Sequence, residues 1–351
     1  MKNFIINLTI IICCFSCTDN KFVSDKEWDS KIEYSHVKII GELPINISRE
    51  IFVVDSLIII SDPFSQPVYN IFKITEEETI EYVFGFGTRG QGPNEFLDNL
   101  GIKIIGNDTL TIFNTSLLRN YLIAKSSLLD DTVSIITENL PNASGFSNNF
   151  IKLDNNLYFG NGTFEKGMFA FYRDGSKIYP TIPYHDDGIA AANMQKNMVY
   201  EGDMLKQPNG NKLAYAAFYG HIFEIYEITQ DTMIKKIFSD IYEYPKYEPV
   251  NTQNYYIDNC TKDNKHGFFT LSATNEYIYA LYCGKTSTEK NPFSANIIYV
   301  YDWDGNKIKK FIIDKEIVGM CSNSQNSRIY SLYEDVEDDI LKVVCFDLKL
   351  P

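Results

Sequence analysis

The sequence has few of the residues on which metal-dependent and nucleophilic catalysis usually depends. Only four of its 351 residues are histidines, and none are spaced as H-x-x-x-H or H-E-x-x-H. It has no G-x-S-x-G segment, and no C-x-x-C pair after the first 17 residues. Helical zinc sites, zinc ribbons, thioredoxin-type redox chemistry and the α/β-hydrolase nucleophile elbow are therefore unsupported.

Positive charge is also scarce. The chain has 32 Lys and Arg against 46 Asp and Glu, which gives a formal net charge of −14 at pH 7. Such a balance argues against nucleic acid or an anionic membrane surface as the partner. The acidic residues are dispersed, which is typical of solvated loops rather than of one acidic site.

The only long apolar run lies at the N-terminus, from Phe4 to Phe15. It is too short to span a bilayer and has the length of a signal-peptide core. Ser16-Cys17 closes it, and a small residue before a cysteine resembles the lipobox of bacterial lipoproteins. We therefore expect a signal peptide over residues 1–16, then a lipid-attachment cysteine, Cys17, and a tether over 17–30. An ordinary secretory signal or a retained anchor is the alternative.

A polar turn followed by a short β-forming run occurs six times, at intervals of roughly 47 to 65 residues. The anchoring residues are Leu57, Leu110, Leu157, Leu213, Ile278 and Ile329. Repeats of this length, each with several short strands, indicate a β-propeller, because one blade cannot bury both of its faces alone. The sequence thus predicts an all-β domain over residues 31–351, a six-bladed β-propeller of four-stranded antiparallel blades.

The outer half of a blade is marked by Asp-Gly between apolar runs, as at Asp174-Gly175 and Asp304-Gly305. Asp-Gly in this setting predicts a tight hairpin. After the last anchor the chain has only enough sequence for strand b and one further strand, Ile340–Leu348. We therefore expect Lys31–Ile40 to supply the outermost strand of the sixth blade, so that the ring is closed by the N-terminal strand.

A glycine-rich segment, Phe84–Phe96, lies between the first two repeats. Its G-x-G-x-x-G spacing does not indicate a dinucleotide site, because Gly92-Pro93 and a strand follow in place of a helix. The segment resembles the G-x-x-G-x-G-P-x-x-F loop of NHL-repeat propellers, and the related segment of TolB-like six-bladed propeller lipoproteins of Gram-negative bacteria. The resemblance implies a propeller and an envelope lipoprotein but no particular activity. We expect Phe96 to plug the space between two blades.

Four cysteines lie beyond the signal region. Cys260 and Cys283 are predicted at the same rim of the fifth blade, within reach of a disulfide. Cys321 and Cys345 are predicted on strands a and c with strand b between them, so we expect both to be free and buried.

The long connections of the predicted ring, 183–196, 240–266 and 284–295, all join strand d to strand a or strand b to strand c, which share one rim. Long loops on a rigid scaffold commonly hold binding groups. We therefore expect a ligand at this rim, at the tunnel mouth. The predicted ligand-binding residues are Arg89, His185, Asp186, Asp187, Tyr219, His221, Tyr255, Tyr256 and His266.

Three functions remain open on the sequence alone. The leading hypothesis is a binding or scaffolding module for a peptide, glycan or protein ligand, lipid-anchored in the cell envelope at the outer membrane, with no cofactor. The alternative is a lactonase-like propeller hydrolase or lyase, with calcium held in the tunnel by Asp62, Asp186 and Asp187. The third is a purely structural envelope component. No catalytic residue is assigned.

Overall fold

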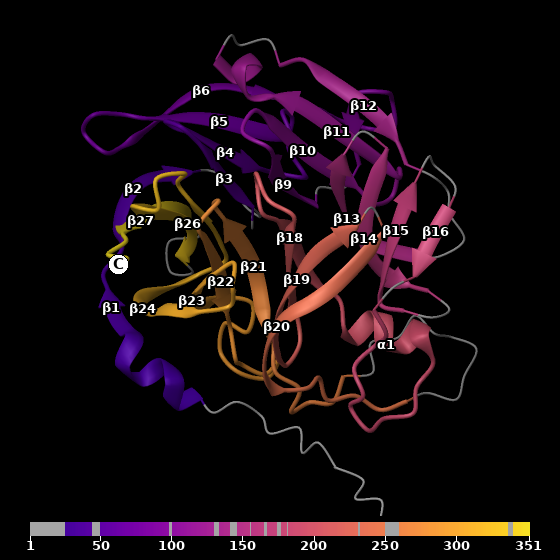
Figure 1. Ribbon diagram of the computed structural model, residues 1–351. Coiled ribbons are helices and arrows are strands. Elements are labelled where there is room, and N and C mark those ends of the chain that lie inside the picture. Colours follow the sequence, from indigo (N-terminus) through magenta and orange to yellow (C-terminus); the bar gives the residue numbers. More distant parts are fainter. Residues whose placement is uncertain are drawn as a thin grey trace, which may run out of the picture.

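The computed structural model describes residues 25–43, 50–97, 100–129, 133–140, 146–154, 156–164, 167–173, 177–180, 182–230, 232–249, 260–335 and 340–351. Six sheets lie side by side around a central axis, and each sheet is one blade (Figure 1). The innermost strand of each blade contacts the innermost strands of both neighbouring blades, so the ring is closed. The predicted all-β, six-bladed propeller is confirmed.

The first three blades follow the strand order a-b-c-d from the axis outward. Blade 1 contains β3 (Ile51–Val54), β4 (Leu57–Ser61), β5 (Tyr69–Ile74) and β6 (Ile80–Phe86). Blade 2 contains β9 (Leu100–Ile105), β10 (Thr109–Asn114), β11 (Arg119–Ala124) and β12 (Ile135–Asn139). Blade 3 contains β13 (Phe146–Asp154), β14 (Leu157–Thr163), β15 (Phe169–Arg173) and β16 (Lys177–Pro180).

The last three blades repeat this order, with additions from the N-terminus. Blade 4 contains β17 (Gly202–Lys206), β18 (Lys212–Ala217), β19 (His221–Gln230) and β20 (Met233–Glu243). Blade 5 contains β21 (Phe268–Ala273), β22 (Tyr277–Tyr282), β23 (Ala295–Asp302) and β24 (Lys307–Ile317). Blade 6 contains β25 (Gly319–Ser322), β26 (Arg328–Asp335) and β27 (Ile340–Asp347).

Each of the six anchors lies in strand b of its blade, and strand b is buried on both faces. In β4, Ile58 and Ile60 pack in a cluster with residues of blade 6, whereas Leu57 and Ile59 pack in a cluster with residues of blade 2. Successive side chains of a strand point to opposite faces, so one apolar run supplies the core on both sides of a blade.

The glycine-rich segment forms a corner between blades 1 and 2, as predicted. It contains a short parallel pair, β7 (Thr88–Arg89) and β8 (Glu95–Phe96). Phe96 is only 1% exposed, and its ring packs against Tyr69 and Tyr121 of the two blades at centroid distances of 5.2 and 4.4 Å. Gly87 has φ +83°, and a Cβ at this position would lie 3.1 Å from the Phe96 ring, which accounts for glycine here.

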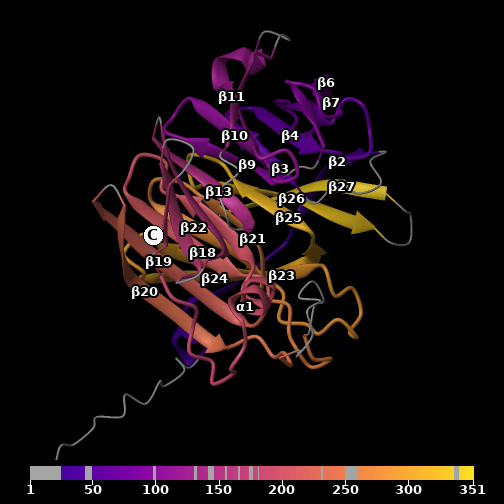
Figure 2. The ribbon, with the colours of Figure 1, turned by 90° about the vertical axis from the view of Figure 1, so that its right-hand side faces the viewer.

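The N-terminal segment closes the ring, but not as the single strand Lys31–Ile40 that the sequence suggested. β2 (Lys38–Leu43) pairs antiparallel with β27 as the outer strand of blade 6, and the two lie side by side in Figures 1 and 2. β1 (Ile32–Ser35) instead pairs in parallel with β24 of blade 5. Between β1 and β2 the chain passes from blade 5 to blade 6. Asp314 holds this connection, because it accepts hydrogen bonds from His36 and from the Val37 amide, both at 2.9 Å.

Three short helical segments complete the described structure. The 3-10 helices are η1 (Asp25–Lys31), before β1, and η2 (Lys125–Leu129), and the α-helix is α1 (Asn193–Val199). No described helix is long and apolar enough to cross a membrane. The predicted signal peptide, Cys17 and the first part of the tether lie outside the described residues, as does the Asp174-Gly175 turn.

Candidate functional site

A central cavity of about 700 Å³, here called the tunnel cavity, is lined by residues of all six innermost strands. Its wall is mainly apolar, with side chains such as Ile51, Ile102, Ile151, Leu271 and Met320. It reaches from the rim formed by the b-to-c and d-to-a connections, here called the loop rim, to the opposite rim. The predicted long connections do join strands d to a or b to c.

Three charged side chains converge in the tunnel cavity from blades 1, 2 and 4. The ammonium of Lys103 donates to Asp203 Oδ1 at 3.1 Å, to Asn149 Oδ1 at 3.4 Å and to the Met204 carbonyl. Glu50 accepts from Ser61 Oγ at 3.2 Å. Burial raises the pKa of Glu50 to about 7, and the negative charge of Asp203 adds to this, while Ser61 and Lys103 oppose it.

A fourth charged group, Glu201, lies immediately before β17 and also lines the tunnel cavity. Burial raises the pKa of its carboxyl above the ordinary value. Among the described residues its carboxylate has neither a hydrogen-bond donor nor a cationic partner. Glu201 therefore differs from Asp203, whose two oxygens both accept hydrogen bonds.

Aromatic rings surround the tunnel cavity at the loop rim of blades 4 and 5. Tyr219 stacks on His266 with a centroid distance of 5.7 Å. His266 also contacts Phe269 at 5.9 Å and Phe293 at 5.1 Å. Tyr219, His266, Phe269 and Phe293 all line the tunnel cavity, and Phe293 is 47% exposed.

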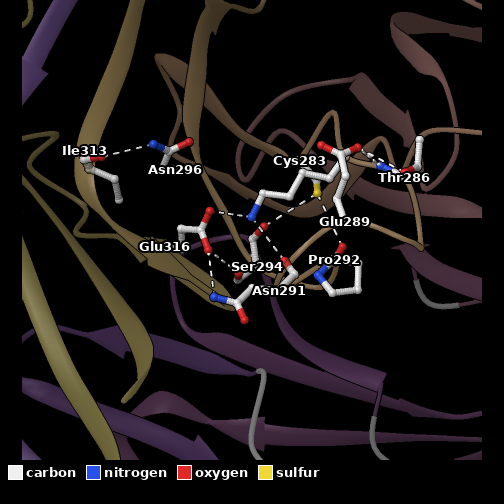
Figure 3. A network of polar contacts seen from close by, with 10 residues as sticks. Cys283, Thr286, Glu289, Asn291, Pro292, Ser294, Asn296, Ile313 and Glu316 are labelled. Atoms are coloured by element: carbon white, nitrogen blue, oxygen red, sulfur yellow. Dashed lines mark hydrogen bonds and ion pairs between the residues drawn. The ribbon is translucent and has the colours of Figure 1, made fainter. Parts of the chain in front are cut away.

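The loop that carries Phe293 is held by the polar network of Figure 3. Glu316 accepts hydrogen bonds from Asn291 Nδ2 and Ser294 Oγ, both at 3.2 Å, and from Lys285. Burial acts to raise the pKa of Glu316, but these bonds outweigh it and lower that pKa. The network gives the b-to-c loop of blade 5 a defined position next to the tunnel mouth.

The structure brings only part of the predicted ligand-binding set together. Tyr219 and His266 line the tunnel cavity at the loop rim, as expected. Arg89 lies apart, with its guanidinium carbon 5.7 Å from the centroid of the exposed Phe64 ring. Tyr255 and Tyr256 lie outside the described residues. Binding by any of these residues remains a prediction.

His185 and Asp187 hold a loop onto blade 4 and do not line the tunnel cavity. His185 Nε2 lies 3.5 Å from Glu224 Oε2. Asp187 accepts from Lys196, Tyr200 and Tyr247 at 2.9, 2.8 and 2.7 Å. These partners give both residues a structural role. Asp186 accepts a local bond from the Gly188 amide, typical of an aspartate in a turn.

His221 is buried in a separate pocket of about 500 Å³ between blades 4 and 5. Its ring lies 4.2 Å from Tyr242 and 4.6 Å from Tyr282, centroid to centroid. Burial lowers the pKa of His221 well below its ordinary value, and Lys307, Lys310 and Lys265 add to this. The imidazole is therefore neutral at physiological pH.

The described residues contain no group of three or more His, Cys, Asp or Glu arranged to hold a metal ion. Asp62 lies in the b-to-c loop of blade 1, where it accepts a local bond from the Phe64 amide at 3.0 Å. Asp62, Asp186 and Asp187 thus form no shared site in the described structure. Calcium binding remains an untested expectation.

No disulfide joins the four described cysteines, so the suggested Cys260–Cys283 disulfide is not formed in the structure. Cys260 forms an isolated β-bridge with Tyr247, whereas the thiol of Cys283 donates to the carbonyls of Pro292 and Ser294 (Figure 3). Cys321 and Cys345 are free and buried, as predicted.

The sequence did not predict that charged residues would line the tunnel cavity. Glu50 and Glu201 each lie just before an innermost strand, and Lys103 and Asp203 lie on such strands. Their position in each repeat was a usable signal, since the starts of all six a strands meet at one end of the tunnel. They resemble ordinary dispersed charges because the residues that meet are about 50 to 150 positions apart.

Two solved structures are similar in fold. One is a member of the DUF4221 family from Bacteroides vulgatus ATCC 8482, with TM-score 0.50 and 12% identity, covering 91% of this chain and 98% of that one. The other is a candidate exported protein of Bacteroides fragilis NCTC 9343, with TM-score 0.52 and 10% identity, covering 91% and 99%. At such identities the likeness concerns the fold alone.

No curated protein matches the sequence. The family profile described as TolB-like 6-blade propeller-like matches residues 28–325, which is most of the chain. The observed ring of six blades agrees with this match. The chain belongs to the TolB-like six-bladed propeller family.

Proposed function

We propose that the protein is a lipid-anchored binding module of the cell envelope, and that its ligand enters the tunnel cavity from the loop rim. The observation that carries the proposal is the tunnel cavity itself. Its volume of about 700 Å³ lies within the range of small-molecule and peptide side-chain sites, and its wall is mainly apolar with a few convergent charges.

The loop rim supports binding in a second way. Tyr219, His266 and Phe293 present rings at the tunnel mouth, and the Glu316 network holds the loop that carries Phe293. A ligand that binds preorganised side chains loses less free energy to their ordering than one that must order them. This favours binding or scaffolding over a purely structural role.

The envelope location rests on the N-terminal sequence. The apolar segment Phe4–Phe15 and Ser16-Cys17 favour export and lipid attachment. Export agrees with the candidate exported protein among the structural neighbours. A lipid on Cys17, followed by a tether, would hold the propeller close to a membrane without embedding it.

A thermal-shift experiment with three water-soluble aromatic probes of similar size tests the tunnel as a binding site. The probes are phenethylamine, 2-phenylethanol and phenylacetate, each added at 10 mM to the purified lipidated protein. A probe present at tenfold its Kd stabilises the folded state by about 1.4 kcal/mol, which is measurable as a rise in Tm.

The control variant fills the tunnel cavity. A Cβ on Gly101 would meet no atom closer than the Glu50 carboxylate at 3.8 Å, so Gly101→Phe can place a ring in the cavity without a backbone clash. Ile136→Phe adds a ring on the exposed strand β12 instead. We expect at least one probe to stabilise the wild type and Ile136→Phe but not Gly101→Phe. Equal shifts in all three proteins, or no shift in any, would contradict the proposal.

A further inference from the structure

We infer that the ligand of the tunnel cavity carries a positively charged amine beside an apolar or aromatic body, as in a lysine-containing or amino-terminal segment of a peptide. This inference rests on the proposed function and names the chemical class of its ligand. It follows from the balance of charges along the tunnel cavity and from the groups that lie at the mouth.

The lysines that line the tunnel cavity each have acceptors on the protein. Lys103 is bonded to Asp203, and Lys125 forms an ion pair with Asp55 at 2.9 Å. Lys206 donates to the carbonyls of Gln207 and Gly210 at 3.1 and 2.5 Å. Burial also lowers the pKa of Lys206. None of the three therefore offers a vacant cationic group to an anionic ligand.

One carboxylate that lines the tunnel cavity is not balanced in the same way. Asp203 is paired with Lys103, and Glu50 interacts with Ser61, Lys103 and the Gly101 amide. Glu201 has no cationic partner among the described residues. A cation beside Glu201 would compensate a partly buried negative charge that the described residues leave without a partner, whereas an anion would add to it.

The acidic and aromatic groups occupy the same end of the tunnel. Glu50 and Glu201 precede strands β3 and β17, and Tyr219, His266 and Phe293 lie in b-to-c or d-to-a connections. All of these positions belong to the loop rim. The faces of aromatic rings attract cations. The alkyl chain that carries an ammonium group can also pack against apolar side chains. Carboxylates and rings at one mouth therefore select an amine attached to an apolar body.

The charge of the whole chain acts in the same direction. A net charge of −14 gives a negative potential that raises the local concentration of cationic ligands and lowers that of anionic ones. The mainly apolar wall below the mouth then offers burial to the body of the ligand. A small inorganic cation would leave this wall unused.

Isothermal titration of the lipidated protein with the same three probes tests the inference. They share a phenylethyl-type body and differ in charge. We expect phenethylamine to bind at least tenfold more tightly than 2-phenylethanol, and phenylacetate to bind most weakly. Raising the NaCl concentration from 50 to 500 mM should reduce the preference for the amine and leave the affinity for 2-phenylethanol nearly unchanged.

Glu201→Gln is the decisive variant, because it keeps the shape of a side chain that forms no hydrogen bond or ion pair with the described residues. It should reduce the preference for phenethylamine to threefold or less without changing the affinity for 2-phenylethanol. Glu227→Gln, a partly exposed carboxylate on β19 away from the tunnel cavity, is the matched control and should keep the full preference.

The outcomes separate the two proposals. Equal binding of the three probes, or tightest binding of phenylacetate, overturns the amine class and leaves the tunnel as a binding site. An unchanged amine preference in Glu201→Gln with a lost preference in Glu50→Gln would keep the class but move the cation to Glu50. Binding by none of the probes overturns both proposals.

Discussion

Asp203 on β17 accepts a hydrogen bond from the backbone amide of Leu271 on β21, at 2.9 Å. Leu271 belongs to the innermost strand of the next blade, whose axis-facing edge has no strand to pair with. An unpaired edge leaves amide and carbonyl groups without partners. The Asp203 carboxylate thus replaces a missing ladder partner and ties blade 4 to blade 5.

Other side chains around the ring also accept hydrogen bonds from backbone amides of a neighbouring blade. Ser272 of blade 5 accepts from the Ser322 amide of blade 6 at 2.9 Å. Glu50 of blade 1 accepts from the Gly101 amide of blade 2, and the Val53 amide of blade 1 bonds to Cys321 of blade 6. Several polar residues of the tunnel cavity therefore support the ring. Glu201 forms no such bond among the described residues.

Asp203→Ala should destabilise the ring by about 2–4 kcal/mol, because it leaves the Leu271 amide and the Lys103 ammonium without this acceptor. Urea unfolding followed by tryptophan fluorescence measures the change. Asp304→Ala is the matched control, since Asp304 forms an exposed ion pair with Lys212 and should cost no more than about 1 kcal/mol. Equal costs for the two variants would show that the edge bond contributes little.

The N-terminal helix η1 should stabilise blades 4 and 5 by packing against both of them. Trp28 is fully buried, packs on Tyr299 and Tyr301 at 4.9 and 5.1 Å, and donates from Nε1 to Tyr242 Oη at 3.1 Å. Trp28→Ala should therefore cost about 3–5 kcal/mol of unfolding free energy.

Trp28→Phe keeps most of the ring packing and loses the hydrogen bond, so it should cost less than half as much as Trp28→Ala. Leu129→Ala, at a side chain that is 69% exposed, is the control and should change the unfolding free energy by less than about 0.5 kcal/mol. Circular dichroism during thermal unfolding is the measurement. A Trp28→Ala variant that melts with the wild type would mean that η1 is not part of the folding unit.

The sequence was informative wherever one blade repeats the local pattern of another. Leu57 and Ile329 could be placed on strand b because a polar turn and an apolar run of fixed period surround each. The plug formed by Phe96 followed from a local motif. The sequence did not predict that residues 31–43 form one strand in blade 5 and another in blade 6. This split depends on Asp314, which lies some 280 positions away.

The candidate site was harder to predict for the same reason. His185 and Asp187 are predicted as ligand-binding groups because a polar cluster in a long loop is typical of binding sites, and their role in binding stays a prediction. Their partners Glu224 and Tyr247 lie on elements that only the folded ring brings near. Glu50 and Glu201 were missed because nothing within their own segments shows that six strand starts meet at one axis.

Cys17 should carry lipid. The short apolar segment that ends at Ser16-Cys17 is the basis of this prediction. Mass spectrometry of the membrane-extracted protein should find a diacylglyceryl-modified cysteine at the mature N-terminus. Cys17→Ala should abolish the modification, whereas Cys14→Ala should leave it intact. An unmodified mature N-terminus in the membrane fraction would contradict the prediction.

Glu224 should make the protein sensitive to acid. Its side chain is fully buried and accepts bonds from Lys236 at 2.8 Å and Ser239 at 3.0 Å, with His185 at 3.5 Å. Burial alone would raise the pKa of Glu224, but the interactions with His185 and Lys236 outweigh it and lower that pKa from 4.5 to about 2. The folded state thus holds this proton less tightly than the unfolded state does.

A depressed pKa contributes stability that is complete above about pH 4.5 and is lost as the pH falls toward 2. Between pH 7 and pH 3.5 the loss due to Glu224 should be about 1.4 kcal/mol. Glu224→Gln should be less stable at pH 7 and should lose less stability over this interval than the wild type. Glu227→Gln, on the same strand, should keep the wild-type dependence. Parallel pH profiles for wild type and Glu224→Gln in urea unfolding would refute the assignment.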